Sequence, residues 1–230
     1  MIQTSRTFRV FVSSTFSDLK VERNALQEKV FPRLRELCSQ HGCRFQAIDL
    51  RWGVSEEAAL DQQAMRICLE EVERCQKLSP RPNIIVLLGD RYGWQPLPYE
   101  IPAEEFEKIV EHIDPMGLAL LYQWYRRDDN AVPPVYCLLS REGQYEDFSV
   151  WEPVEKEMLF FLRRAVGAIS LSPESSIKYY SSATEQEIVR GALNATGSEK
   201  HVFCFFRNFE ILPEGTEARQ FLDLEIPIRL

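Results

Sequence analysis

The sequence lacks the features that mark membrane, secreted and nucleic-acid-binding proteins. No apolar run approaches the roughly 20 residues that span a bilayer, and the opening residues, MIQTSRTFRV, contain no signal-peptide core. Lysine and arginine form no cluster, and the formal net charge is -8, which disfavours a nucleic-acid groove. We therefore expect a cytoplasmic protein with no membrane segment and no nucleic-acid partner.

Cysteine and histidine are too scattered to indicate a metal site or a disulfide framework. The cysteines have no CxxC spacing, and the histidines are isolated from one another and from acidic pairs. These residues are Cys38, Cys43, Cys68, Cys75, Cys137, Cys204, His41, His112 and His201. Cys68 and Cys75 are seven residues apart on a predicted helix and share its buried face. We expect reduced core thiols and no metal.

Motifs of the common hydrolases, kinases and nucleotide-binding folds are also missing. The sequence contains no GxSxG, no GxxxxGK[ST], and no GxGxxG after the first predicted strand. Any chemistry must therefore come from residues that the fold brings together.

The segment from Asn83 to Trp94, NIIVLLGDRYGW, is the most informative stretch that is present. Ile84 to Leu88 are five apolar residues without polar alternation, which indicates a strand covered on both faces of a parallel sheet. Polar and glycine residues follow directly. In open α/β sheets, ligands bind at this carboxyl edge of the strands.

The first 94 residues alternate strands and helices. Strands are predicted at 7–14, 45–50 and 84–88, with amphipathic helices at 19–40 and 60–75 between them. Pro32 should kink or split the first helix. This βαβαβ order predicts an α/β, flavodoxin-like parallel sheet with helices on both faces.

Residues 95–178 interrupt this order and are too numerous for an ordinary connection. We predict a helical insertion there, with aromatic residues that pack its core and a short strand or extended loop at 135–139. The predicted helices lie near 103–112, 115–126 and 153–166, and the aromatics are Trp124, Tyr125, Trp151, Phe160 and Phe161.

The alternation of helices and strands resumes with a helix at 185–193, capped by Ser182 or Thr184, and a buried strand at 202–206. The chain is thus predicted to be one domain, 1–230, with its core at about 6–94 and 179–209, and we expect the natural chain to continue.

The loops at the carboxyl edge hold the candidate functional side chains. They are Ser13, Ser14, Asp49, Arg51, Trp52, Gly89, Asp90, Arg91, Tyr92 and Arg207. The start of the helix after Ser181 offers free N–H groups that suit a phosphate or a ribose hydroxyl. On spacing alone, the favoured role of Glu185 or Glu187 is that of a simple partner of the helix dipole. Residues 89–93 could form a turn without a binding role. Arg51 and Trp52 could be an exposed loop contact.

Three of these segments together resemble a TIR-type domain. FRVFVSSTFSDLKVERNAL resembles the opening strand and first helix of that family, DLRWGV the loop after its second strand, and SSATEQEIVRGAL the helix that carries its catalytic glutamate. Glu187, followed by Ile188, falls on the catalytic position, and Glu185 is the alternative. Ala183 stands where many active members have tryptophan, so a stacking surface would come from elsewhere.

Four segments, STFSDLKVERNAL, DLRWGVSEEAA, LLGDRYGW and TEQEI, more closely resemble the TIR-like domains at the N-terminus of NACHT or STAND signalling ATPases that carry WD or tetratricopeptide repeats. The resemblance implies self-association, attached ATPase and repeat domains, and cleavage of the nicotinamide–ribose bond of NAD, which is the substrate, with no other cofactor. Glu187 would stabilise the oxocarbenium-like ribose. The substrate-binding candidates are Ser13, Ser14, Arg51, Trp52, Asp90, Arg91 and Tyr92, of which Trp52 or Tyr92 would stack on a base and Arg51 or Arg91 would meet the pyrophosphate.

Two other functions are consistent with the same residues. One is a non-catalytic adaptor that self-associates through Arg51, Trp52 and the acidic run at 55–57. The other is glycosyl transfer from a nucleotide or nucleoside to an acceptor other than water.

Overall fold

The computed structural model of the chain describes residues 6–50, 59–211 and 218–223. It divides into two compact units. The first contains residues 1–53, 68–94 and 182–230, and the second contains 54–67 and 95–181. The sequence had not indicated that residues 54–67 belong with the interposed segment.

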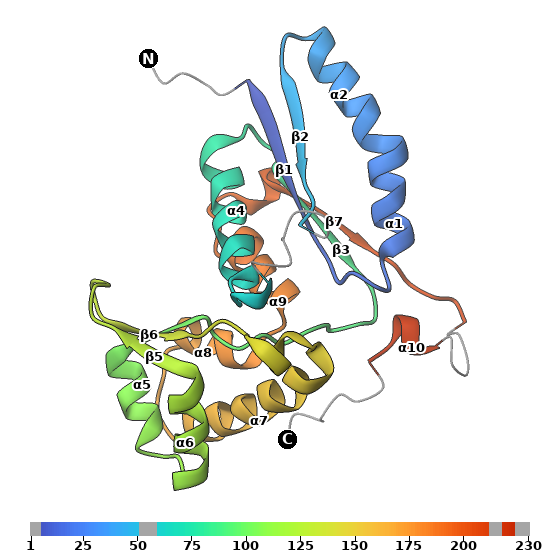
Figure 1. The fold of residues 1–230 in the computed structure, drawn as a ribbon. Helices are drawn as coiled ribbons and strands as arrows, with labels where there is room; N and C mark the ends of the chain where they lie inside the picture. The colour runs from blue at the N-terminus through green and yellow to red at the C-terminus, as the bar shows by residue number, and fades with distance from the viewer. Residues whose placement is uncertain (1–5, 51–58, 212–217, 224–230) are drawn as a thin grey trace. The chain divides into compact units, whose positions relative to one another are not determined.

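A four-stranded parallel sheet forms the centre of the first unit, as predicted (Figure 1). Its order is β2 (Arg44–Ile48), β1 (Thr7–Ser13), β3 (Ile84–Leu88) and β7 (Val202–Phe206). Phe11 of β1 is in register with Ile48 on one side and with Ile84 on the other. The α/β fold with a flavodoxin-like parallel sheet is confirmed.

Helices cover both faces of this sheet. One face carries α1 (Lys20–Ala25), the π-helical turn η1 (Leu26–Val30) and α2 (Phe31–Gln40). The other carries α4 (Ala64–Leu78), α9 (Ala183–Ile188) and the π-helical turn η3 (Val189–Leu193) (Figure 1). The break expected at Pro32 takes the form of η1, since proline has no N–H to continue the α-helical pattern.

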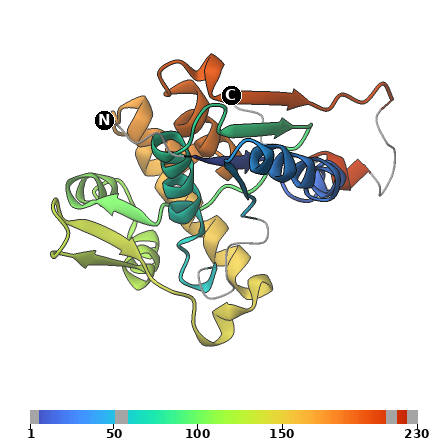
Figure 2. The same ribbon diagram turned by 90° about the horizontal axis from the view of Figure 1, so that it is seen from above.

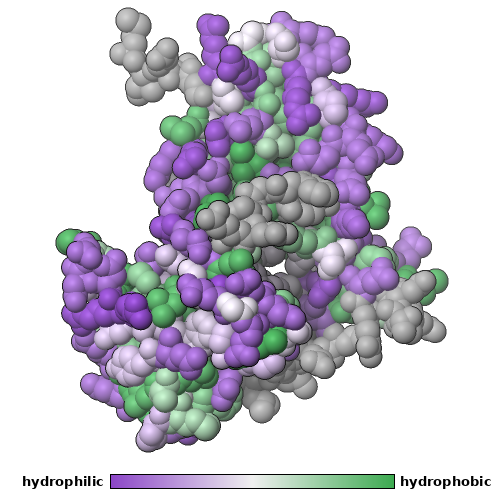
Figure 3. Space-filling view, viewed as in Figure 1, coloured by the Kyte–Doolittle hydropathy of each residue, from purple (hydrophilic) through white to green (hydrophobic). Residues whose placement is uncertain are grey.

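Apolar side chains seal the layer between α1–α2 and the sheet. Val12, Leu19, Phe31 and Leu87 are buried there together. In Figure 3 hydrophobic residues form a strip over the strands, and the flanking helices are mainly hydrophilic on their outer surfaces. The arrangement is that of an amphipathic helix covering a parallel sheet.

The prediction that β7 is buried was wrong. Phe203 and Phe205 are each 55% exposed, and Phe206 is 69% exposed. β7 pairs with β3 alone and lies at the edge of the sheet (Figure 2). Within the described ranges, no strand pairs with its outer edge, so the apolar run marks a strand but not its burial.

The second unit contains a sheet of which the sequence analysis indicated one strand, the short strand given as an alternative at 135–139. Strands β4 (Glu100–Pro102), β6 (Val135–Leu138) and β5 (Tyr125–Asp128) are antiparallel in that order. Its helices are α5 (Ala103–Val110), α6 (Pro115–Trp124), η2 (Gly143–Glu146), α7 (Phe148–Val166) and α8 (Pro173–Tyr180). Residues 125 and 126 had been assigned to the end of a helix, whereas α6 ends at Trp124 and the chain continues as β5.

Aromatic side chains fill the core of the second unit. Phe106 stacks on Tyr136 with ring centroids 4.0 Å apart, and Trp124 meets Trp151 edge-on at 4.7 Å. Four of the five aromatics expected to pack are buried, whereas Phe160 is 60% exposed.

The polypeptide leaves the first unit after Trp94 and returns at Ser182. The Ala183 N–H donates to the Trp94 carbonyl at 2.9 Å. Within the second unit, the Gln95 amide donates to the Tyr180 carbonyl at 2.7 Å. Each unit therefore contains a hydrogen bond that pairs the chain on either side of the 95–181 segment's two ends. The remaining short elements of the first unit are η4 (Ser198–Lys200) and α10 (Ala218–Phe221).

We expect Gly191→Ala to destabilise the first unit. A Cβ atom at Gly191 would lie 2.7 Å from Ile84 Cδ1 and 3.0 Å from Val72 Cγ1, so η3 approaches β3 and α4 only because residue 191 has no side chain. The overpacking should lower the free energy of unfolding by about 1–3 kcal/mol, measured by urea denaturation. Leu193→Ala, at an exposed position of the same turn, should change it by less than about 0.5 kcal/mol. A Gly191→Ala protein as stable as the parent would contradict this account.

Candidate functional site

Helix α9 places Glu187 beside the carboxyl end of β1. The helix begins after Ser182, whose hydroxyl accepts a hydrogen bond from the Glu185 N–H at 3.2 Å. This is a serine N-cap, one of the two caps predicted. Glu187 then lies on the inner side of the first helical turns and is only 8% exposed.

The carboxylate of Glu187 is held by side chains from β1 and α4. The Ser13 hydroxyl donates to Glu187 Oε2 at 2.5 Å. The Cys68 thiol also hydrogen-bonds to this carboxyl group, and the charge of Arg23 acts on it. Ser13, a predicted substrate-binding residue, is therefore a direct partner of the predicted catalytic residue.

Burial raises the pKa of Glu187 from 4.5 to about 7. The hydrogen bond from Ser13, the charge of Arg23 and the hydrogen bond from Cys68 act in the opposite direction and offset part of the effect. Burial, followed by the neighbouring Glu187, raises the pKa of the Cys68 thiol well above its usual range, so Cys68 stays a neutral donor. Glu187 can thus gain or lose a proton near neutral pH, which suits acid–base chemistry.

Arg23 is a component of the site that the sequence analysis missed. Its guanidinium is buried, donates to the Val12 carbonyl at 2.5 Å and pairs with Asp49 at 3.4 Å. A signal was present, since Arg23 lies four residues after Leu19 and three before Leu26, on the apolar stripe of the helix. A charged residue at such a position needs a buried partner.

Tyr92 links the loop after β3 to the start of α9. Its hydroxyl donates to Glu185, and it accepts from the Ser182 N–H at 3.2 Å. Glu185, the alternative catalytic residue, is therefore a partner of Tyr92, and Glu187 alone of the two contacts Ser13.

Among the described residues, three other predicted substrate-binding residues have hydrogen bonds, ion pairs or exposure that direct them elsewhere than to Glu187. The Ser14 hydroxyl donates to the Thr15 carbonyl at 2.6 Å, Asp90 is exposed, and Arg91 pairs with Asp223 at 2.9 Å. Arg51 and Trp52 lie outside the described residues, so their predicted roles stay predictions.

Arg207 and Asp18 occupy the space next to Gly89 at the carboxyl edge of β3. Arg207 Nη2 is 3.0 Å from Asp18 Oδ2. A Cβ atom at residue 89 would lie 2.5 Å from Arg207 Nη2 and 2.8 Å from Asp18 Oδ2. A side chain at residue 89 would therefore displace the Arg207–Asp18 ion pair from its present position.

We expect the ionisation of Glu187 to make stability depend on pH. Its pKa in the folded state is above the unfolded value, so its contribution is fully present below about pH 4.5 and is lost as pH rises through about 7. The parent chain should lose about 3 kcal/mol across this window relative to Glu187→Gln. Urea denaturation of both proteins between pH 4.5 and 8 measures the difference, with Glu199→Gln, an exposed carboxylate, as the control. Parallel pH profiles for the parent and Glu187→Gln would contradict this assignment.

Comparison with known proteins identifies a domain family. Residues 9–122 match the domain of unknown function DUF4062. The chain is 34% identical over 200 residues to NACHT domain- and WD repeat-containing protein 1 of Mus musculus. The aligned region covers 84% of this chain and 12% of that protein. It is 32% identical over 248 residues to NACHT and WD repeat domain-containing protein 2 of Homo sapiens, covering 97% and 14%. A shorter match, 39% over 97 residues, is to Telomerase protein component 1 of Rattus norvegicus, covering 42% and 4%.

The chain spans only about an eighth of the length of these NACHT and WD repeat proteins. No solved structure matches it. Of the helices within the described ranges, none has the length and apolar character that a bilayer span requires. The chain carries a DUF4062 domain and is homologous to part of the NACHT and WD repeat proteins.

Proposed function

We propose that the first unit is an effector domain that cleaves the nicotinamide–ribose bond of NAD, with Glu187 as the catalytic residue. The observation that carries the proposal is a buried carboxyl group with a pKa of about 7, hydrogen-bonded to Ser13 at the carboxyl edge of a parallel sheet. The resemblance of α9 and β1 to the corresponding TIR segments supports the same assignment.

Cleavage of NAD at this bond places positive charge on the ribose. The C1′–N bond breaks, its electron pair leaves with neutral nicotinamide, and water then adds to C1′ and releases a proton. An ionised carboxylate beside C1′ or the ribose hydroxyls stabilises the oxocarbenium-like transition state. Ser13 and Arg23 favour the charged carboxylate and so offset part of the effect of burial, which raises the pKa of Glu187 to about 7.

The closed environment of Glu187 requires a conformational step before catalysis. The side chain is only 8% exposed, so a ribose can reach it only after neighbouring groups move. The relatives are named for NACHT and WD repeat domains. In the proposal, an attached ATPase of this kind assembles several effector domains and thereby opens the site.

We expect Glu187→Gln to lower the rate of nicotinamide release by at least about 100-fold. The parent rate should rise with pH through about 7, because the ionised carboxylate is the active form. Chromatography of NAD incubated with concentrated protein, alone and in the full-length natural chain, measures both effects.

Glu185→Gln tests the alternative carboxylate, and retention of its activity would assign the reaction to Glu187. Unchanged NAD in the presence of the assembled full-length protein would refute the proposal. Analysis of the products would separate hydrolysis from glycosyl transfer.

A non-catalytic interaction module is the second candidate, and the edge strand β7 favours it. Phe203, Phe205 and Phe206 are exposed on a strand that pairs on one side only, and exposed apolar groups of this kind mark contact surfaces. Under this function, the double substitution Phe203→Ser and Phe205→Ser would abolish self-association and signalling, and Glu187→Gln would leave both intact. The reverse pattern would exclude it.

A further inference from the structure

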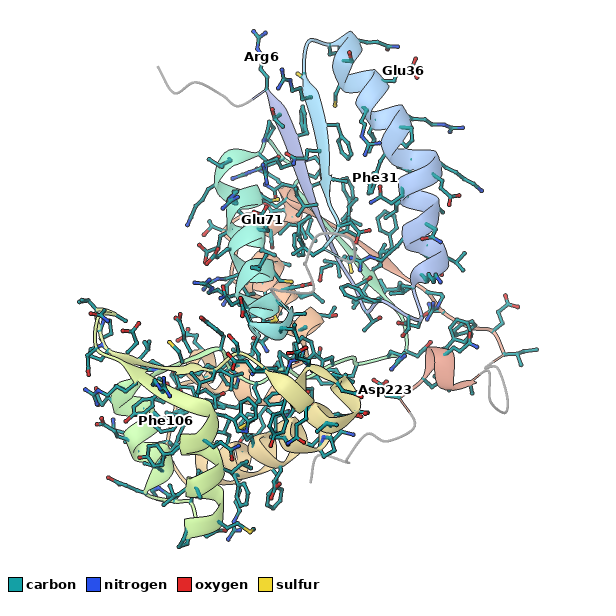
Figure 4. The ribbon with its side chains drawn as sticks, viewed as in Figure 1. Arg6, Phe31, Glu36, Glu71, Phe106 and Asp223 are labelled. Atoms are coloured by element: carbon teal, nitrogen blue, oxygen red, sulfur yellow. The ribbon has the colours of Figure 1, made fainter. Side chains whose placement is uncertain are left out.

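The carboxylate of Asp223 lies in the loop that follows β3. Asp223 Oδ2 accepts hydrogen bonds from the Tyr92 N–H at 2.6 Å and the Gly93 N–H at 3.0 Å. Asp223 Oδ1 accepts from Arg91 Nε at 2.9 Å. Asp223, labelled in Figure 4, follows α10, some 130 residues along the chain from the loop that it contacts.

The three donors form an arrangement that recognises phosphate. Two successive backbone N–H groups converge on one oxygen, and a guanidinium meets the other, as in backbone anion sites supported by arginine. Gly93 has a φ of +88°, which favours glycine at this position of the loop. The side chains of Arg91 and Asp223 are 27% and 20% exposed, so an anion from solution can reach this position.

The loop with these donors also contacts the helix that carries Glu187. The backbone N–H of Tyr92 binds Asp223, and its hydroxyl binds Glu185 and the Ser182 N–H at the start of α9. An anion at the Asp223 position is therefore connected through Tyr92 to the start of α9, the helix that carries Glu187.

Contacts around Arg207 hold α10 next to this loop. The Arg207 guanidinium lies 4.9 Å from the Phe209 ring centroid and 5.1 Å from that of Phe221. The two rings meet edge-on at 5.2 Å. Partial burial raises the pKa of Asp223, but the hydrogen bonds from Gly93, Arg91 and Tyr92 outweigh it and lower the pKa. Asp223 is therefore an ionised group held at the site.

We propose that Arg91 and the N–H groups of Tyr92 and Gly93 form a phosphate-binding site for a nucleotide, and that Asp223 occupies it as a built-in competitor. The ligand's phosphate and the Asp223 carboxylate use the same donors, so binding releases the segment 218–223 from the loop. That the bound phosphate is the diphosphate of NAD rests on the proposed function. That a phosphate and Asp223 compete for the same donors does not depend on the proposed function.

Competition of this kind reduces the apparent affinity for the ligand, because the intrinsic affinity is multiplied by the fraction of molecules in which the site is free. If Asp223 occupies the site in about 90–99% of molecules, its removal tightens binding by about 10- to 100-fold. Asp223→Asn keeps the size of the side chain and removes the charge that pairs with Arg91.

Calorimetric titration with ADP-ribose tests the proposal. This probe carries the diphosphate and lacks the nicotinamide bond, so its binding does not depend on cleavage. We expect Asp223→Asn to bind it at least about 10-fold more tightly than the parent, and the added substitution Arg91→Ala to remove the gain. Glu210→Gln removes an exposed carboxylate between β7 and α10 and should leave the affinity unchanged. Adenosine, which has no phosphate, should bind equally to the parent and Asp223→Asn.

An unchanged affinity of Asp223→Asn for ADP-ribose, or an equal gain in Glu210→Gln, would overturn the proposal. A second measurement uses the parent chain and does not depend on the folding of a variant. Inorganic pyrophosphate should increase chymotryptic cleavage after Phe221, because the segment is displaced, and protection of this bond would also overturn it. Tighter binding by Asp223→Asn, together with unchanged NAD in the presence of the assembled full-length protein, would support the competitor and refute the nucleosidase.

Discussion

The hydrogen bond between Ser13 and Glu187 joins residues 174 positions apart at the carboxyl edge of the parallel sheet. It connects the end of β1 to α9, the last α-helix before β7. The bond forms where α9 packs against β1, and Glu187 is buried there. Arg23 and Cys68 complete the enclosure. The same packing that stabilises the sheet therefore sets the acid–base properties of the candidate catalytic group.

Local patterns in the sequence were sufficient to predict the strands of the parallel sheet and a capped helix over 185–193, and the resemblance to the TIR family then singled out Glu187 on that helix. The unbroken run at Ile84–Leu88 and the serine cap before α9 have direct physical causes, which are burial on both faces and an unsatisfied helix start. The tertiary partners of these elements were not predictable in the same way. β5 follows α6 without a glycine or proline, so nothing local marks where the helix ends. The exposure of β7 depends on what covers it, which no local pattern encodes.

The candidate site shows the same limit. Its carboxylate and the serine beside it came from segments with recognisable strand and helix signals, whereas its charged neighbours came from tertiary contacts. Arg91 was one of two arginines, with Arg51, expected to meet a pyrophosphate, and in this structure it pairs with Asp223. Sequence reasoning identified the donor, but the carboxylate that faces it follows a short helix far along the chain, and no spacing rule connects the two. The loop after β3 therefore contains the arginine that the sequence singled out, and the group bound to that arginine is the carboxylate of Asp223.

The two ends of the segment 95–181 are held together by hydrogen bonds, and this affects how the chain folds. Pairing β3 with β7 formally requires the closure of a loop of more than 100 residues, from Leu88 to Val202. The Gln95–Tyr180 bond within the second unit, and the Trp94–Ala183 bond within the first, bring the two ends of that loop together. Once residues 95–181 have formed their own aromatic core, the entropic cost of adding the last strand is that of a short connection. The large insertion therefore imposes little kinetic penalty on the sheet that it interrupts.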